Sequence, residues 1–140
     1  MPCLGIAMKL LQGNRMTGVE INFCVYDVLK AFDLYEKVFD AEIVEKTANK
    51  RGMNEVVFTI LGSRFHMLDE SPENGLNAPK EGHPTAIWIN IMVEKIQPVY
   101  DKALGLSFTL IFDMQELPDH HTKRFMVKDP FGMVWLVHGN

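Results

Sequence analysis

Polar side chains alternate with apolar ones in residues 19–27 of this 140-residue chain. In an extended strand, alternate side chains point to the same face of a sheet, so the pattern sets a polar face against an apolar one. The polar face carries a carboxylate, an amide and a thiol, which belong to Glu20, Asn22 and Cys24. A carboxylate can bind a metal or act as a base, and a thiol can act as a nucleophile. For Cys24 we favour a small packed residue, because no histidine or basic residue precedes it closely in sequence.

A similar alternation returns in residues 86–95, where the face opposite the isoleucines carries Trp88, Asn90, Met92 and Glu94. Asn22 and Asn90 occupy matching positions of the two segments, and buried amides need hydrogen-bond partners. They either bond to each other across a pseudo-twofold axis, which we favour, or face a ligand. Trp88 is either a core residue or the aromatic floor of a ligand site.

A third polar group is DHHTKR, residues 119–124, which gathers two histidines and two cations before a predicted strand. We interpret this group mainly as a solvated loop. The alternative is capture of an anion, because the guanidinium of Arg124 can hold a carboxylate or phosphonate through two parallel hydrogen bonds.

The composition excludes several classes of function. The formal charge is −4, with 14 basic and 18 acidic residues well mixed, so no basic stripe indicates a nucleic-acid partner. No apolar run reaches the length of a membrane span. Neither GxGxxG nor a Walker-type loop occurs, which argues against a nucleotide cofactor. Two cysteines are too few for a disulfide framework, and residues 1–16 lack the features of a signal peptide, so we predict a cytoplasmic protein.

The elements that must position these side chains occur twice in one order, strand–helix–strand–strand–strand. Each half has a helix with apolar residues at helical spacing, and the first helix is preceded by Asp27, a suitable N-cap. Each half ends in a β-hairpin, with Gly62 and Gly132 at equivalent turns. We therefore predict an α+β fold of two βαβββ modules.

The predicted domain boundaries follow from these repeats. The modules would span residues 17–70 and 85–139, within one domain at 17–139. The polar, proline-containing stretch at 71–84 would link them, and residues 1–16 would be a leader or an irregular N-terminus.

In this order the motifs resemble the vicinal oxygen chelate superfamily, which includes glyoxalase I, bleomycin-resistance proteins, fosfomycin-resistance enzymes and extradiol dioxygenases. The matching stretches are FDLYEKVFDAEIVEK, FHMLDESP and KDPFGMVWLV. DPFG followed by an aromatic residue, together with MLDE, is similar to the PhnB-like branch. The resemblance implies a curved eight-stranded mixed sheet around a cleft between the modules, and a homodimer.

The superfamily's metal enzymes place ligands at four positions, which the resemblance carries onto Glu20, His66, Trp88 and Leu136. Only Glu20 and His66 can ligate a divalent metal such as zinc, nickel, manganese or iron, and two ligands hold a metal weakly. A nonstandard site that adds His138, two residues beyond Leu136, is an alternative. Otherwise Glu20 is a half-buried carboxylate satisfied by His66 or by an arginine.

Three functions remain open from the sequence. The resemblance favours a PhnB-like protein of unassigned reaction that binds a small molecule in the cleft, as a metal-dependent lyase, isomerase or dioxygenase with Glu20 as the catalytic residue. The alternative is a metal-free small-molecule or drug-binding protein of the bleomycin-resistance type. The third is a structural or regulatory protein without a small ligand. The ligand-binding candidates are Asn22, Cys24, His66, Trp88, Asn90, Met92, Arg124, Leu136 and His138.

Overall fold

The computed structural model of the chain describes residues 18–83 and 86–140. The chain divides into two compact units, and the boundary in the sequence lies between Ala78 and Pro79. Each unit contains one α-helix and a four-stranded mixed sheet among the described residues, so the predicted βαβββ modules are confirmed. The expected leader, residues 1–16, lies outside the described residues.

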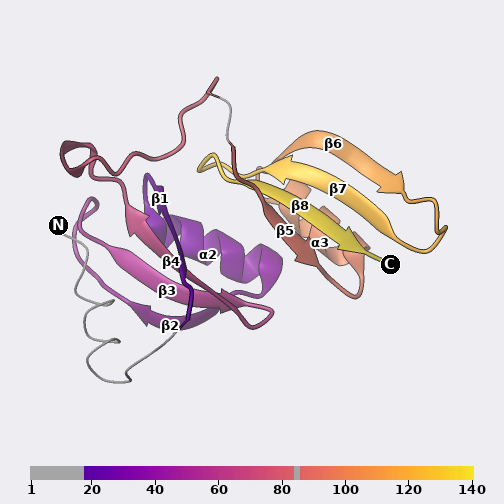
Figure 1. The fold of residues 1–140 in the computed structure, drawn as a ribbon, viewed down its shortest axis with the longest axis horizontal. Helices are drawn as coiled ribbons and strands as arrows, with labels where there is room; N and C mark the ends of the chain where they lie inside the picture. The colour runs from indigo at the N-terminus through magenta and orange to yellow at the C-terminus, as the bar shows by residue number, and fades with distance from the viewer. Residues whose placement is uncertain (1–17, 84–85) are drawn as a thin grey trace. The chain divides into compact units, whose positions relative to one another are not determined.

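The first module contains β1 (Ile21–Val25), α2 (Val28–Phe39), β2 (Glu42–Lys46), β3 (Glu55–Ile60) and β4 (Ser63–Asp69). The strand order is β1-β4-β3-β2, with β1 parallel to β4 and the other pairs antiparallel. Helix α2 lies along one face of this sheet (Figure 1). The last strand, β4, therefore lies inside the sheet between the first strand and the third.

Helix α2 forms where the sequence predicts it. The Asp27 side chain accepts a hydrogen bond from the backbone N–H of Lys30 at 3.2 Å, which caps the N-terminus. The helix ends at Asp40, whose φ of 54° is left-handed. The buried side chains of the helix follow the predicted apolar spacing: Val28, Ala31, Phe32, Tyr35, Val38 and Phe39.

Phe58 of β3 forms the centre of the first core. It is fully buried, and its ring lies 5.7 Å from that of Phe32 and 5.4 Å from that of Phe65. Because Phe58 and Phe65 face α2, the alternating residues Val57 and His66 lie on the other face of the sheet. We call this second face, which does not carry the helix, the open face of the module.

The second module contains β5 (Ile89–Met92), α3 (Ile96–Gly105), β6 (Thr109–Glu116), β7 (Lys123–Lys128) and β8 (Val134–Gly139). The strand order is β5-β8-β7-β6, with β5 parallel to β8, which repeats the pattern of the first module. Phe125 and Trp135 are fully buried, and Tyr100 of α3 contacts the Phe125 ring edge-on at 5.2 Å. Side chains that alternate with Phe125 along β7 therefore lie on the open face.

The two hairpin turns predicted as equivalents are present. Leu61 and Gly62 form a two-residue turn between β3 and β4, with φ of 49° and 84°. In the second module the turn contains Gly132, with φ of 93°, and Gly132 N–H donates to the Asp129 carbonyl at 3.1 Å. Both glycines therefore occupy left-handed backbone that other residues rarely adopt.

The segment between β4 and β5 contains little regular secondary structure in its described residues. It contains one 3₁₀ turn, η1 (Pro72–Asn74), and an isolated bridge between Ser71 and Leu76. No helix in residues 18–83 and 86–140 is long and apolar enough to cross a membrane.

Candidate functional site

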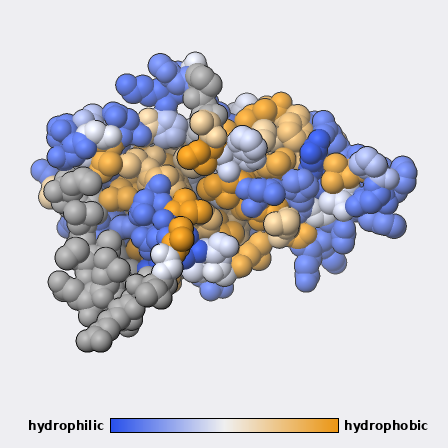
Figure 2. Space-filling model, in the orientation of Figure 1, coloured by the Kyte–Doolittle hydropathy of each residue, from blue (hydrophilic) through white to orange (hydrophobic). Residues whose placement is uncertain are grey.

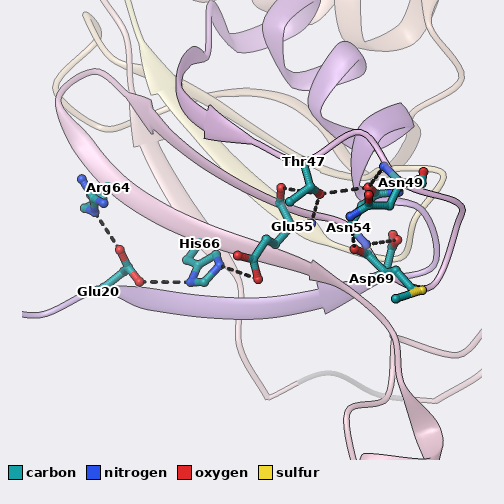
Figure 3. Close-up of polar contacts among 9 residues, drawn as sticks. Glu20, Thr47, Asn49, Asn54, Glu55, Arg64, His66 and Asp69 are labelled. Atoms are coloured by element: carbon teal, nitrogen blue, oxygen red, sulfur yellow. Dashed lines mark hydrogen bonds and ion pairs between the residues drawn. The ribbon is translucent and has the colours of Figure 1, made fainter. Parts of the chain in front are cut away.

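The polar centre of the first module is Glu20, which lies just before β1 (Figure 3). One carboxylate oxygen, Oε2, accepts from Arg64 Nε at 2.7 Å. The other, Oε1, lies 3.2 Å from His66 Nδ1. The carboxylate is thus held by both partner types considered from the sequence, a histidine and an arginine. Both of its oxygens are engaged within the module.

Strand register explains this arrangement. Arg64 and His66 are two residues apart on β4, so both side chains lie on the open face. β1 runs parallel to β4 with Asn22 opposite His66, which places Glu20 beside Arg64 at the next position of the same face. Asn22 itself is exposed and donates to the Glu20 carbonyl at 3.4 Å.

A second carboxylate lies on the far side of the His66 ring. Glu55 Oε2 is 3.8 Å from His66 Nε2, and both side chains are almost fully buried. The ring thus lies between two carboxylates, Glu20 and Glu55, as Figure 3 shows. At 3.8 Å the contact between Glu55 Oε2 and His66 Nε2 is within the range of an ion pair but too long for a hydrogen bond. Glu20, His66 and Glu55 thus form a row of polar groups, in which His66 and Glu55 are buried and Glu20 is partly exposed.

Cys24 lies further along β1, opposite Leu68 of β4. Partial burial, and then the nearby Glu70 carboxylate, raise the pKa of the Cys24 thiol above its ordinary value. A raised pKa disfavours the thiolate, which is the reactive form. The interpretation of Cys24 as a packed residue rather than a nucleophile stays a prediction.

The second module brings Asn90 and His138 together. Asn90 Oδ1 lies 2.8 Å from His138 Nδ1, across the parallel pair β5 and β8. Because an amide oxygen only accepts, a hydrogen bond in this orientation requires the tautomer of His138 that carries its proton on Nδ1. Each asparagine therefore has a partner within its own module.

Arg124 lies beside this pair rather than in the loop before β7. It is opposite His138 in the β7–β8 register and opposite Gln115 in the β6–β7 register. Its Nε donates to Gln115 Oε1 at 3.3 Å, and its Cζ lies 5.5 Å from the centre of the Phe112 ring. The guanidinium is thus positioned by an amide and an aromatic ring.

Three other predicted ligand-binding residues surround this face. Leu136 is opposite Asn90, and Met92 is opposite His138. Trp88 precedes β5 and is 53% exposed, so its interpretation as a core residue is wrong. The core tryptophan of this module is Trp135, which is fully buried.

The loop between β6 and β7 behaves as a solvated turn. Asp119 Oδ1 accepts from the backbone N–H groups of His121 and Thr122 at 2.9 and 2.8 Å, and Oδ2 accepts from the Thr122 hydroxyl at 2.7 Å. Figure 2 shows hydrophilic side chains at the tip of this hairpin, and both His120 and His121 are exposed. The two loop histidines are therefore surface groups, in contrast to the strand residue Arg124.

Sequence reasoning missed several participants. The role of Arg64 could have been found from the sequence. Arg64 precedes His66 by two residues, so the two side chains must share one face of a strand. No signal in the linear sequence indicated Glu55, because only the pairing of β3 with β4 brings its side chain to His66. Gln115 and Phe112 come to Arg124 through a β6–β7 register that contains irregularities.

Comparison with known proteins defines the class. Residues 19–137 match the model of the Glyoxalase/Bleomycin resistance protein/Dioxygenase superfamily. The chain belongs to this superfamily, as its paired βαβββ modules also indicate. No curated protein sequence matches it significantly.

Solved structures with the same fold are distant in sequence. TioX from Micromonospora sp. ML1 is 13% identical with a TM-score of 0.66, over 89% of this chain and 98% of TioX. A FosX mutant from Listeria monocytogenes, complexed with Mn(II) and 1S,2S-dihydroxypropylphosphonic acid, is 15% identical with a TM-score of 0.66, over 89% and 92%. The PhnB protein from Bacillus cereus is 19% identical with a TM-score of 0.67, over 89% and 100%. These likenesses show the fold.

The donor set does not fit the superfamily's four-ligand metal centre. Of the four expected positions, Trp88 and Leu136 have no ligating atom suited to a divalent cation. Glu20 is bound to Arg64 on one side and to His66 on the other. No group of three or more histidine, cysteine, aspartate or glutamate side chains in residues 18–83 and 86–140 is arranged to hold a metal ion.

Proposed function

We propose that this chain is a PhnB-like member of its superfamily that binds a small organic molecule on the open faces of its sheets, without a four-ligand metal centre. The observation that carries the proposal is the state of Glu20, whose two oxygens are held by Arg64 and His66. A carboxylate fixed in this way serves as a structural and electrostatic element of a binding surface. It would have to leave both partners to become a metal ligand.

The composition of the open face of the second module supports binding of an organic ligand. Ligand sites combine apolar area with a few placed polar groups. Met92, Leu136 and Phe112 supply apolar surface, while Asn90 and Arg124 supply hydrogen-bond donors or acceptors.

Tryptophan fluorescence tests this proposal directly. The half-exposed Trp88 should respond when a ligand binds, whereas the buried Trp135 should not. We expect a saturable fluorescence change with at least one compound in a panel of aromatic carboxylates, phosphonates, fosfomycin and bleomycin. The Trp88→Phe variant should lose the change while keeping the Trp135 signal. A flat response to the whole panel, checked by calorimetry for ligands that do not affect Trp88, would refute small-molecule binding of this kind.

The rival hypothesis is a metal-dependent lyase, isomerase or dioxygenase in which Glu20 is catalytic. The proximity of Glu20 and His66, at 3.2 Å, is the observation that favours it. Elemental analysis after gentle purification separates the two. Near-stoichiometric zinc, nickel, manganese or iron that is lost in both Glu20→Ala and His66→Ala would support the metalloenzyme and overturn our proposal.

A further inference from the structure

The two modules differ in whether a carboxylate pairs with the half-buried arginine on the open face. In the first module Arg64 is neutralised by Glu20 at 2.7 Å. In the second, Arg124 also lies half-buried on an open face, and no carboxylate in residues 18–83 and 86–140 forms an ion pair with it. A guanidinium that is partly removed from water gains from a counter-ion, because burial penalises an unpaired charge.

The neighbours of Arg124 hold it in place without neutralising it. Gln115 Oε1 accepts from Nε at 3.3 Å, and the Phe112 ring lies 5.5 Å from Cζ. This uses one of the five N–H donors of the guanidinium. The terminal nitrogens Nη1 and Nη2, which form the edge that binds oxyanions bidentately, have no protein partner among the described residues.

The acidic residues of β6 and the one just after β7 have other partners. Asp113 accepts from the Tyr100 hydroxyl at 2.7 Å, and Asp129 accepts from Trp135 Nε1 at 2.9 Å. Glu116 lies opposite Lys123 in the β6–β7 register, one position from the pair Gln115 and Arg124. Because neighbouring residues of a strand point to opposite faces, the Glu116 side chain points away from the open face. None of these three carboxylates forms an ion pair with Arg124.

His138 adds a second polar group at the next strand. It lies opposite Arg124 in the β7–β8 register, and Asn90 fixes its Nδ1. Neighbouring strands are about 5 Å apart, so a ligand bound at Arg124 is within reach of the other ring nitrogen, Nε2. Nε2 accepts from a ligand hydroxyl in the neutral ring and donates to an oxyanion in the protonated ring.

From this arrangement we infer that the open face of the second module carries an oxyanion subsite, with Arg124 as its principal donor and His138 beside it. The ligand class is a small organic molecule with a carboxylate or phosphonate group, whose oxygens meet the Nη1/Nη2 edge. The inference rests on the proposed small-molecule function and narrows its ligand to anions of this kind.

Solution NMR with small anions tests the subsite. The probes are methylphosphonate and acetate, titrated at constant ionic strength set by chloride, with neutral acetamide as the reference compound. We expect saturable shifts of the Arg124 Nε–H resonance and of backbone amides in β7 and β8. The Arg124→Gln variant should weaken binding about tenfold or more, since it removes the charge-assisted bonds. Arg124→Lys should give an intermediate loss, because ammonium lacks the bidentate edge.

Lys123→Gln is the matched control. It removes one positive charge from the adjacent residue of β7, which is exposed and lies on the other face of the strand. Its affinity for the anions should remain within about twofold of the wild type, because exposed charges are screened by salt. Equal losses in Lys123→Gln and Arg124→Gln, or equal shifts with acetamide, would overturn the subsite in favour of general electrostatics or nonspecific contact.

The outcomes also separate this inference from the proposed function. A neutral ligand that changes Trp88 fluorescence, combined with no anion response at Arg124, overturns the subsite and keeps small-molecule binding. Saturable anion shifts at Arg124, combined with no organic ligand by fluorescence or calorimetry, support the subsite and overturn the broader proposal.

Discussion

Glu20 lies two residues before the register partner of His66, and its carboxylate contacts the His66 ring at 3.2 Å. The second module repeats this offset, because Asn90 lies two residues before Met92, the register partner of His138, and contacts that ring at 2.8 Å. In each module a histidine of the last strand is therefore contacted by a polar side chain of the first strand or of the residue just before it. In the first module this side chain is a carboxylate, and in the second it is a neutral amide.

The Glu20→Gln substitution should lower the free energy of unfolding by about 1 kcal/mol, because Arg64 and the buried His66 lose a charged partner. The expected loss is modest since Glu20 and Arg64 are both 24% exposed. Urea denaturation measures it. The control is Glu42→Gln, which removes an exposed carboxylate from β2 and should change stability by no more than about 0.5 kcal/mol. Equal effects of the two substitutions would contradict a structural role for the Glu20 cluster.

Asp69→Asn should be more damaging, at about 2 kcal/mol or more. The fully buried Asp69 accepts from the backbone N–H of Val28 at 2.9 Å, of Gly52 at 2.8 Å and of Asn54 at 2.9 Å. An amide must turn an NH₂ group toward one of these donors, which leaves that donor unsatisfied. Denaturant unfolding of Asp69→Asn and of Asp33→Asn, an exposed change on α2, provides the comparison. A loss for Asp69→Asn no larger than for Asp33→Asn would refute this role.

Two glycine-to-alanine changes should differ in cost. Gly62 and Gly132 both have positive φ, of 84° and 93°, so alanine should cost about 1 kcal/mol at either position from backbone strain. At Gly132 an added Cβ would also lie 2.7 Å from Pro79 Cβ, whereas no atom lies within 4 Å at Gly62. We expect Gly132→Ala to be the more destabilising by about 1 kcal/mol or more in thermal unfolding. The reverse order would contradict the Pro79 contact.

Asp119 should titrate well below an ordinary aspartate. Hydrogen bonds from the Thr122 backbone and hydroxyl, and then from the His121 backbone, lower its pKa from 3.8 to about 2. The charged form therefore contributes to the turn fully above pH 3.8, and this contribution is lost as the pH falls toward about 2. NMR titration of the His121 and Thr122 amides should give a midpoint near the lower value, absent in Asp119→Asn. A midpoint near 4 would show that the turn does not hold the carboxylate.

The Cys24 thiol should react slowly with iodoacetamide at neutral pH. Burial and the Glu70 carboxylate both raise its pKa, so little thiolate is present. A Cys3→Ser background leaves Cys24 as the remaining cysteine. The Glu70→Gln substitution should lower the pKa and increase the alkylation rate, while Glu73→Gln serves as the control. An unchanged rate in Glu70→Gln would show that burial alone controls the thiol.

The fold could be predicted from the sequence because its signals are local. Helical spacing after Asp27, alternation along the strands and the glycines at 62 and 132 each depend on residues that are close in sequence. The repeat of these signals in the second half then predicted two similar modules. Of the two interpretations of Trp88, the core residue was wrong, because Trp88 precedes β5 and is 53% exposed, while the aromatic floor of a ligand site stays a prediction.

The polar clusters were harder to predict, since they depend on pairing between strands. Glu20 and His66 came from the resemblance, but the position of Glu55 next to His66 follows only from the β3–β4 register. Arg124 is the last residue of the polar group 119–124, which its composition indicated to be mainly a solvated loop. Its contacts with Gln115 and Phe112 require the β6–β7 pairing, which the linear sequence does not reveal.

The internal position of each module's last strand determines when a sheet can be completed during synthesis. β4 lies between β1 and β3, so the first sheet is complete once the chain has emerged to Asp69. β8 lies between β5 and β7, so the second sheet waits for residues 134–139, and until then β5 has no partner strand. On the ribosome, the first module can therefore fold while the second is an open hairpin and an unpaired strand. Its exposed β5 and β7 edges are then the part of the nascent chain most available to chaperones or to incorrect pairing.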